Sequence, residues 1–335
     1  MSNEGQTPDL TGDRGFRTVR ESTYRYALAG CAVLSVLTTV SIIAVLVLDA
    51  ADFFSVVPIA EFLTATEFSA SEPTTFGVLP LALGTMLITI GAAVIALPVG
   101  LLTAIYLSEY ATERTRSVLK PMLEVLAGVP TVVYGYFAIV YITPALNVVI
   151  GWLNGALGLG FPNLGLFNGL SASLVVGIMI IPMVSSISED AMSSVPDSLR
   201  QAGYGLGATK FNVSLRIVVP AAISGIASSF ILAISRAIGE TMAVVLAAGS
   251  QPPDIPAVQS AFGIPYVAPG DLIGLYTESS ATMTVAMINI ASGDISGGST
   301  AYKSLFAIGL TLFVITLAMN VVSDVVASRY REEYE

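Results

Sequence analysis

The chain has 335 residues, of which 54% are hydrophobic and 11% are charged, and its formal net charge is −10. Its mean hydropathy of +0.79 excludes an ordinary soluble domain, and its apolar runs reach the roughly 20 residues that a bilayer-spanning helix needs. Histidine is absent and Cys31 is the only cysteine, which excludes a disulfide framework and removes the most common general base and metal ligand, so we expect no enzyme.

Six apolar runs predict an all-α, polytopic membrane protein. Residues 1–26 are too polar and too long for the start of a cleavable signal, and we read them as a cytoplasmic tail. Prolines inside the runs are tolerated because neighbouring helices satisfy the carbonyls that they free. The six spans are expected at about 27–48, 82–107, 121–144, 170–188, 220–247 and 304–326.

The positions of Lys and Arg predict the orientation, because cytoplasmic loops are enriched in these residues. Twelve of the 14 basic residues fall on one side of a six-span arrangement. Both termini and the fourth connection are therefore expected to be cytoplasmic, in a multi-pass protein of the plasma membrane. The twelve residues are Arg14, Arg17, Arg20, Arg25, Arg114, Arg116, Lys120, Arg200, Lys210, Arg216, Arg329 and Arg331.

The opposite loops are acidic, and Lys303 is their one basic residue. Solvated carboxylates keep a surface hydrated in high salt, so a halophilic host is a hypothesis, and such loops offer no attractive funnel for an anion. Within loop 248–303, the stretch 272–291 has helical apolar spacing and predicts either an ordered external helix, the interpretation we favour, or a re-entrant one. The acidic residues are Asp49, Asp52, Glu61, Glu67, Glu72, Asp254, Asp271, Glu278 and Asp294.

The fourth connection predicts two short helices joined by a glycine turn. A first helix over 199–204 can end at Gly205 and Gly207, because glycine adopts positive φ without strain. Thr209 can cap a second helix that runs towards Pro220 and the fifth span. Two interpretations fit this pattern: a compact knob that docks into a soluble partner, or an interfacial amphipathic hairpin.

The fifth span carries two charges near its middle, where a charged side chain costs about 2.5–3.5 kcal/mol on insertion scales. Arg236 and Glu240 are spaced i to i+4 and can pair on one helix face. One interpretation is a static ion pair that fixes helix packing. The other places Arg236 on a solute path, because its guanidinium binds oxyanions in bidentate fashion and stays charged. Gly239 would allow close approach, and Thr241 completes the candidate path.

The fourth connection resembles the cytoplasmic loop of ATP-binding-cassette importer permeases, whose pattern is E-A-A, three residues, Gly, nine residues, then I-x-L-P. Here Gln201, Ala202 and Gly203 stand first, Gly207 follows at the same gap, and the stretch that begins at Ile217 ends in proline. Gln replaces the acidic residue and Gly the second Ala. The resemblance assigns ATPase coupling to Gln201, Ala202, Gly203, Gly207, Ile217 and Pro220.

Four stretches are similar to those of PstC-type membrane subunits of phosphate importers: 129–135 (VPTVVYG), 195–200 (VPDSLR), 236–244 (RAIGETMAV) and 283–286 (MTVA). The resemblance implies a type I importer permease fold and a phosphate path at Arg236, Gly239, Glu240 and Thr241. It also implies a PstA-type second permease, a pair of PstB-type ATPases and an external PstS-type phosphate-binding protein, without nucleic acid. The implied organisation is a tail (1–26), a first helix with an acidic external loop (27–75), a transmembrane domain (76–327) with a coupling loop (190–220), and a second tail (328–335).

A P-loop is absent from the sequence, so ATP and Mg are expected to bind a partner ATPase, and no cofactor is expected in this chain. The mechanism that follows is alternating access, in which the ATPase pushes on the fourth connection and the fifth span carries the motion to Arg236. Three alternatives stay open. They are a permease for another oxyanion such as sulfate or molybdate, a stand-alone ion-coupled carrier or channel, and a non-transporting scaffold.

Overall fold

The computed structural model describes residues 14–71, 73–158, 160–256, 258–261 and 264–329. Within these residues, five helical segments are long and apolar enough to cross a bilayer, and a bent helix pair at 210–238 supplies a sixth. The prediction of an all-α protein with about six spans is confirmed. The five segments are Glu21–Phe54, Leu79–Tyr110, Thr131–Leu157, Gly169–Ser193 and Thr300–Val322.

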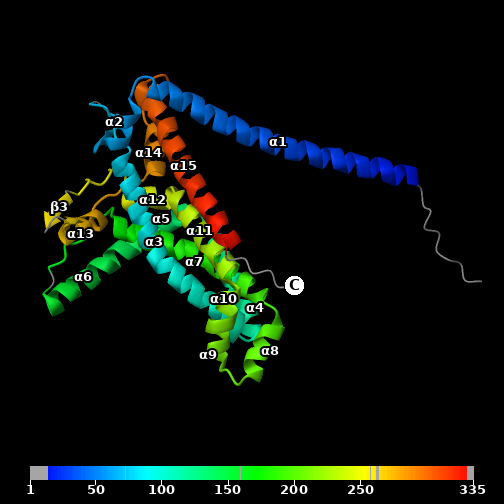
Figure 1. Cartoon of the computed structure of the whole chain (residues 1–335). Helices are drawn as coiled ribbons and strands as arrows, with labels where there is room; N and C mark the ends of the chain where they lie inside the picture. The colour runs from blue at the N-terminus through cyan, green and yellow to red at the C-terminus, as the bar shows by residue number, and fades with distance from the viewer. Residues whose placement is uncertain (1–13, 72, 159, 257, 262–263, 330–335) are drawn as a thin grey trace, which may run out of the picture.

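Helices dominate the described part of the chain, and three of them contain a π-helical turn (Figure 1). Two small antiparallel hairpins pair Phe68 with Phe76 and Val258 with Val267. In chain order the elements are α1 (Arg14–Phe54), α2 (Ile59–Thr64), β1 (Phe68–Ser69), β2 (Thr75–Phe76), α3 (Leu79–Ile105), η1 (Tyr106–Tyr110), α4 (Glu113–Ala127), α5 (Thr131–Phe137), η2 (Ala138–Ile142), α6 (Thr143–Leu157), α7 (Gly169–Ser193), α8 (Asp197–Gly205), α9 (Lys210–Val213), η3 (Ser214–Val218), α10 (Val219–Ala221), α11 (Ile223–Ile238), α12 (Met242–Ala248), β3 (Val258–Ala261), β4 (Ile264–Val267), α13 (Pro269–Thr277), α14 (Met283–Ser292) and α15 (Thr300–Arg329).

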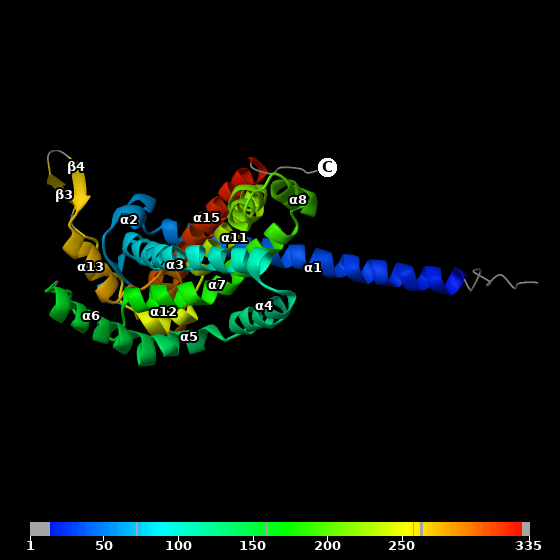
Figure 2. The same ribbon diagram turned by 90° about the horizontal axis from the view of Figure 1, so that it is seen from below.

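Helices α3 and α7 form the centre of the bundle and lie side by side in both ribbon views (Figures 1 and 2). Of the spans, α7 is the most buried, with 61% of its most apolar window inside the protein. Glycines let the two backbones approach closely, as small residues do between membrane helices. A Cβ atom at Gly91 would lie 2.5 Å from Ser173 Oγ, and one at Gly100 would lie 2.6 Å from Val184 Cβ.

Replacing Gly100 with leucine is expected to destabilise the protein, because the side chain has no room between α3 and α7. Overpacking of this kind costs about 1–3 kcal/mol, which lowers the melting temperature in detergent by several degrees. The matched control is Gly151→Leu in α6, where a Cβ atom meets nothing within 4 Å. Equal melting temperatures for the two variants would contradict the close α3–α7 contact.

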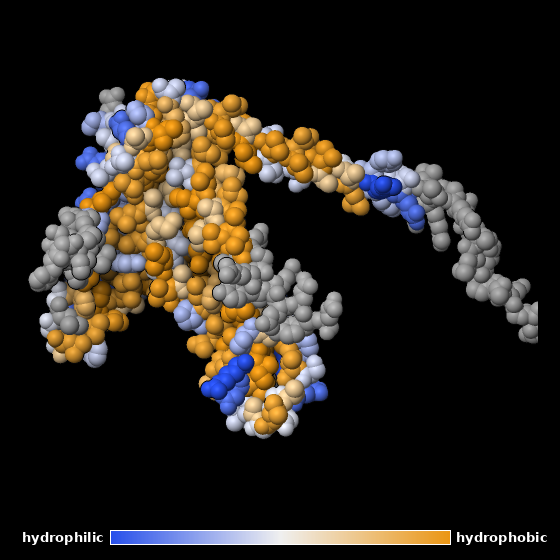
Figure 3. All heavy atoms as spheres, in the orientation of Figure 1, coloured by the Kyte–Doolittle hydropathy of each residue, from blue (hydrophilic) through white to orange (hydrophobic). Residues whose placement is uncertain are grey.

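Helix α1 extends away from the rest of the structure and is shown in blue in Figure 1. No residue in its most apolar window is buried within the described chain. Only its C-terminal end packs into the core, where the ring of Phe53 makes edge contacts with Phe54, Phe62 and Phe76. The space-filling view shows apolar side chains along most of this helix and over most of the bundle surface (Figure 3).

The third span does not lie at 121–144, as the sequence predicted, but at Thr131–Leu157. Pro130 is extended (φ −57°, ψ 133°) and ends the preceding helix, because proline disfavours helical geometry in the residue before it. Residues Glu113–Ala127 form the separate helix α4, which is capped by Thr112 and buries no side chain. The Tyr134 hydroxyl donates to Leu126 O at 2.7 Å and closes the end of α4. The apolar residues of 121–144 are therefore divided between α4 and the helical span that begins at Thr131.

The fifth span is not one continuous helix over 220–247. It bends by 71° between Lys210–Ala221 and Ile223–Ile238, and α11 then ends at Ile238. The second break, at residues 239–241, has a physical basis, because its freed backbone groups find partners inside the protein. Glu240 Oε1 accepts from Ala243 N at 3.3 Å, and Thr284 Oγ1 donates to Glu240 O at 2.9 Å.

The stretch 272–291, for which an ordered external helix was favoured, is not one continuous helix. The stretch divides into the end of α13, an extended turn and α14, and α14 packs against α3, α12 and α15. Met283 and Val285, in the first turn of α14, have no exposed surface. Met283 N donates to Thr85 Oγ1 at 3.0 Å, which anchors the start of α14 to α3.

Candidate functional site: a knob and an arginine-lined cavity

Residues 197–221 form a protruding helical hairpin, which we call the knob (Figure 1). Helix α8 is one arm, and α9, η3 and α10 form the other. Pro196 precedes α8, and Thr209 caps α9 by accepting from Asn212 N at 3.4 Å. Gly207 has φ +79° and ends α8: Gly207 N donates to Tyr204 O at 2.9 Å, and Ala208 N donates to Gly203 O at 3.1 Å. This pair of bonds is a Schellman motif, which requires a left-handed residue at Gly207. Gly205 stays helical, contrary to the sequence prediction.

The two arms of the knob pack directly on each other. Gly203 is buried, and a Cβ atom there would lie 2.7 Å from Ile217 Cδ1 and 3.0 Å from Val213 Cγ2. Glycine in place of the second alanine of the importer pattern therefore brings α8 close to α9 and η3. At the tip, Leu206 is 89% exposed and Phe211 is 62% exposed. An apolar tip on a polar knob (Figure 3) is a surface suited to docking.

The six residues predicted for coupling separate into two groups in the structure. Four are exposed on the knob and can touch another chain. Two belong to its internal packing, where Gly203 is buried and Ile217 is half-buried. The exposed four are Gln201, Ala202, Gly207 and Pro220.

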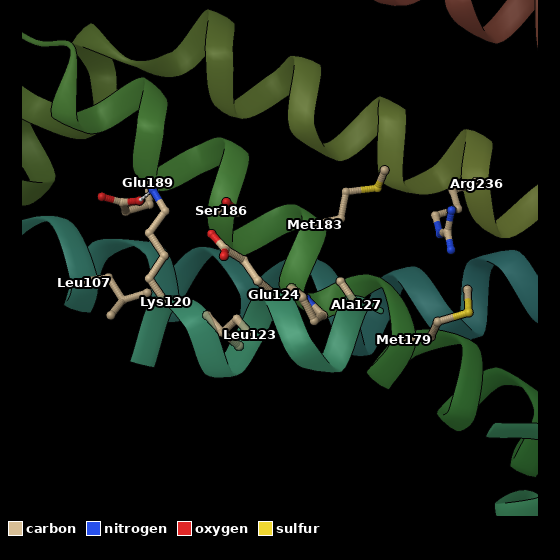
Figure 4. A pocket seen from close by; sticks show the side chains of 11 residues that line it. Leu107, Lys120, Leu123, Glu124, Ala127, Met179, Met183, Ser186, Glu189 and Arg236 are labelled. Atoms are coloured by element: carbon tan, nitrogen blue, oxygen red, sulfur yellow. Dashed lines mark hydrogen bonds and ion pairs between the residues drawn. The ribbon is translucent and has the colours of Figure 1, made fainter. Parts of the chain in front are cut away.

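Arg236 lines a cavity of about 290 Å³ between η1, α4, α7 and α11 (Figure 4). The residue lies in the last turn of α11 and is exposed in the single chain. Within the described chain, Arg236 makes no hydrogen bond or ion pair. Lys120 and Glu189 lie towards the other end of the cavity in Figure 4. The Arg236 guanidinium thus faces the cavity and has no hydrogen-bond or ion-pair partner among the described residues.

The predicted pairing of Arg236 with Glu240 is wrong for the described structure. The i to i+4 rule needs a continuous helix, and α11 ends between the two residues. Glu240 is 8% exposed and caps α12 instead, so it is committed to the backbone. Gly239 and Thr241 flank it in the break, where Thr241 Oγ1 donates to Gly239 O at 3.2 Å. Neither Gly239, Glu240 nor Thr241 lines the Arg236 cavity.

Three of the sequence stretches that resemble phosphate permeases meet around α12. Gly135 from the first stretch approaches α12 so closely that a Cβ atom would lie 2.9 Å from Ala243 O. Thr284 from the last stretch donates to Glu240 O. The fifth span is therefore packed between α5 and α14 at the interruption that separates α11 from α12. These contacts fix α11 and α12 relative to each other.

The sequence reasoning missed the polar residues around the cavity and beneath the knob. Glu189 on α7 has no exposed surface and accepts hydrogen bonds from Arg116, from Lys120 Nζ at 2.7 Å and from Ser193 Oγ at 3.1 Å. Hydrogen bonds to Asp190 and Glu189 raise the pKa of Lys120, which keeps it charged at neutral pH. The charged residues in 109–124 and 189–200 are visible in the sequence. Their pairing across these two ranges is not, because the partners lie about 70 to 90 residues apart.

Comparison with known proteins identifies the family. Residues 96–332 match the family described as "Binding-protein-dependent transport system inner membrane component". The chain belongs to this family. It is therefore a multi-pass inner-membrane component of a binding-protein-dependent importer, a transport subunit rather than a catalytic one.

Similar proteins include relatives and solved structures of the same class. The chain is 30% identical to Bacillus subtilis "Probable ABC transporter permease protein YqgH" over 96% of this chain and 95% of the relative. It is 33% identical to "Phosphate transport system permease protein PstC" of Xylella fastidiosa (strain Temecula1) over 80% and 78% of the two chains. A chain of the bacterial alginate ABC transporter in complex with its alginate-bound periplasmic protein superposes with a TM-score of 0.60, at 14% identity, over 95% of this chain and 98% of that one. The type I importer permease fold is thereby confirmed.

Proposed function

We propose that this protein is the permease subunit of an ATP-driven importer of inorganic phosphate and forms half of the solute path. The observation that carries the proposal is Arg236, which lines the cavity and makes no hydrogen bond or ion pair with the residues that the structure describes. A guanidinium binds a tetrahedral oxyanion through paired, charge-assisted hydrogen bonds. Relatives named as phosphate permeases support the choice of phosphate.

The partners proposed for this chain follow from its surfaces. The knob presents Leu206 and Phe211 to an ATPase pair of the PstB type, which would bind ATP and Mg and hydrolyse the ATP. A PstA-type permease would complete the path, with both termini and the knob in the cytoplasm. At the opposite end, Asp254, Asp271 and Glu278 line an acidic pocket. Carboxylates there repel a free anion, so delivery by a PstS-type binding protein is required.

Transport competition tests the solute. In proteoliposomes with the assembled complex and its binding protein, unlabelled phosphate is expected to abolish uptake of labelled phosphate, whereas sulfate and molybdate at the same concentration leave it unchanged. Vesicles without the binding protein are the control and are expected to take up almost none. Stronger inhibition by sulfate or molybdate than by phosphate would assign the path to another oxyanion. Robust ATP-driven uptake without the binding protein would contradict the proposed delivery.

A further inference from the structure

Arg200 is the most highly connected side chain at the knob end of the described structure. It lies on α8, its side chain is 15% exposed, and its guanidinium donates to Glu109 of η1, to the end of α7 and to Asp197 of its own helix. Nη2 donates to Met192 O at 2.8 Å, and Nη1 donates to Val195 O, so the side chain caps the end of α7. Nε and Nη2 donate to Glu109 Oε1 at 3.2 and 3.1 Å, which ties α8 to the π-helical end of α3.

Glu109, the ion-pair partner of Arg200, is also buried. Its side chain is 4% exposed, and it lies in η1, which continues directly from the central helix α3. A buried carboxylate without a cation is strongly unfavourable, so the pair resists separation. The other arm of the knob reaches the same turn, because Lys210 Nζ lies 5.1 Å from the centroid of the Tyr110 ring. Both arms of the knob are thus fastened to the end of α3.

The covalent route from the knob into the membrane is less direct. It passes through α9, η3 and α10 and then bends by 71° before α11 begins. Backbone hydrogen bonds from Ala222 N to Val218 O and from Ile226 N to Ala222 O join the two sides of this bend, but the helix axis changes direction there. The fastening at Arg200 bypasses it and joins the knob to α3 and α7, the most tightly packed pair in the bundle.

We propose that Arg200 is a positioning residue that makes the knob, α3 and α7 move as one rigid unit during the ATP cycle. The inference rests on the proposed function, because it takes the knob to be the contact for an ATPase. The unit extends to α4, since Glu189 at the same end of α7 holds Arg116 and Lys120. Helix α4 carries Lys120, Leu123 and Glu124 on the wall of the Arg236 cavity. Displacement of the unit therefore moves these walls of the cavity relative to Arg236 on α11.

Distance measurements in the assembled complex test the unit directly. Spin labels are placed at Leu102 on α3 and Ser198 on α8, both exposed, in a chain with Cys31→Ser. The distance is expected to be equal in the nucleotide-free and vanadate-trapped states when Arg200 is present. In Arg200→Gln it is expected to differ between the states. A second pair, with labels at the exposed Ser117 of α4 and at Ser198, is expected to behave in the same way.

The matched control is Arg216→Gln on the other arm of the knob. Arg216 is exposed and, within the described residues, makes no hydrogen bond or ion pair, so its variant is expected to behave as the parent chain. Arg200→Lys is expected to be intermediate, because one ammonium cannot reach all the acceptors that the planar guanidinium serves. If Arg200→Gln fails to assemble, Glu109→Gln replaces it, since this variant frees α3 alone and keeps the cap on α7.

A functional readout separates coupling from mere folding. In assembled complexes, Arg200→Gln is expected to raise the ATP hydrolysed per solute moved by about tenfold, a change that corresponds to about 1.4 kcal/mol. Arg216→Gln leaves the ratio unchanged. A state-dependent distance in the parent chain, or an unchanged ratio in Arg200→Gln, would overturn the proposal. A wrong phosphate assignment would give a different result. The parent complex would then transport no phosphate, but its spin-label distances would still be equal in the two nucleotide states.

Discussion

Arg236→Gln is expected to reduce ATP-driven phosphate uptake by about 10- to 150-fold, which corresponds to the roughly 1.5–3 kcal/mol that a hydrogen bond to a charged group contributes. Glutamine keeps much of the side-chain volume but removes the charge and the paired donors. Because Arg236 makes no hydrogen bond or ion pair within the described chain, its loss breaks no such contact there. The complex is therefore expected to assemble and to retain ATPase activity. Uptake of labelled phosphate per assembled complex is the measurement.

Two further variants make this result specific. Ser235→Ala changes the neighbouring residue, whose hydroxyl donates to Asn320 Oδ1 at 3.2 Å on α15, and uptake is expected to stay near normal. Arg236→Lys keeps the charge but loses bidentate geometry, so partial uptake is expected. Normal phosphate uptake by Arg236→Gln would remove the residue from the path. Loss of assembly in the same variant would instead return it to a structural role.

The sequence predicted the apolar spans well because span length is set by bilayer thickness, and the family resemblance predicted the knob. Thr209 and Gly207 act within one or two helical turns of their own position, so local rules find them. The third and fifth spans were misplaced for a different reason. Hydropathy does not show where a helix stops when polar side chains from elsewhere satisfy the break, as Thr284 does at Glu240.

The polar network beneath the knob could not be predicted from spacing. Arg200 and Glu109 are 91 positions apart, and Lys120 and Glu189 are 69 apart. A single sequence gives no signal that such distant residues contact each other. Arg236 and Glu240 were predicted to pair because they are only four positions apart in the chain. The structure reverses these expectations. The local pair is broken by the end of α11, and the distant charges form the buried contacts.

Gly207→Val is expected to uncouple transport from ATP hydrolysis while membrane insertion stays intact. Gly207 has φ +79°, a conformation in which a β-branched residue is strained by about 1–3 kcal/mol. The strain is relieved by rotating the turn, which breaks the two hydrogen bonds that end α8 and redirects the exposed Leu206. The helices that cross the bilayer are not touched. The measurement is the ratio of solute transported to ATP hydrolysed, with the amount of protein in the membrane determined in parallel.

Gly205→Val is the matched control, because it introduces the same side chain two residues away. Gly205 is helical, and a Cβ atom at either glycine meets nothing within 4 Å, so the two positions differ in backbone conformation and not in space. Near-normal coupling is expected for Gly205→Val, and partial coupling for Gly207→Asn, since asparagine tolerates the left-handed region. Equal loss of coupling at both positions would mean that the added side chain obstructs docking. Loss confined to Gly207→Val would locate the effect in the angle between the two arms of the knob.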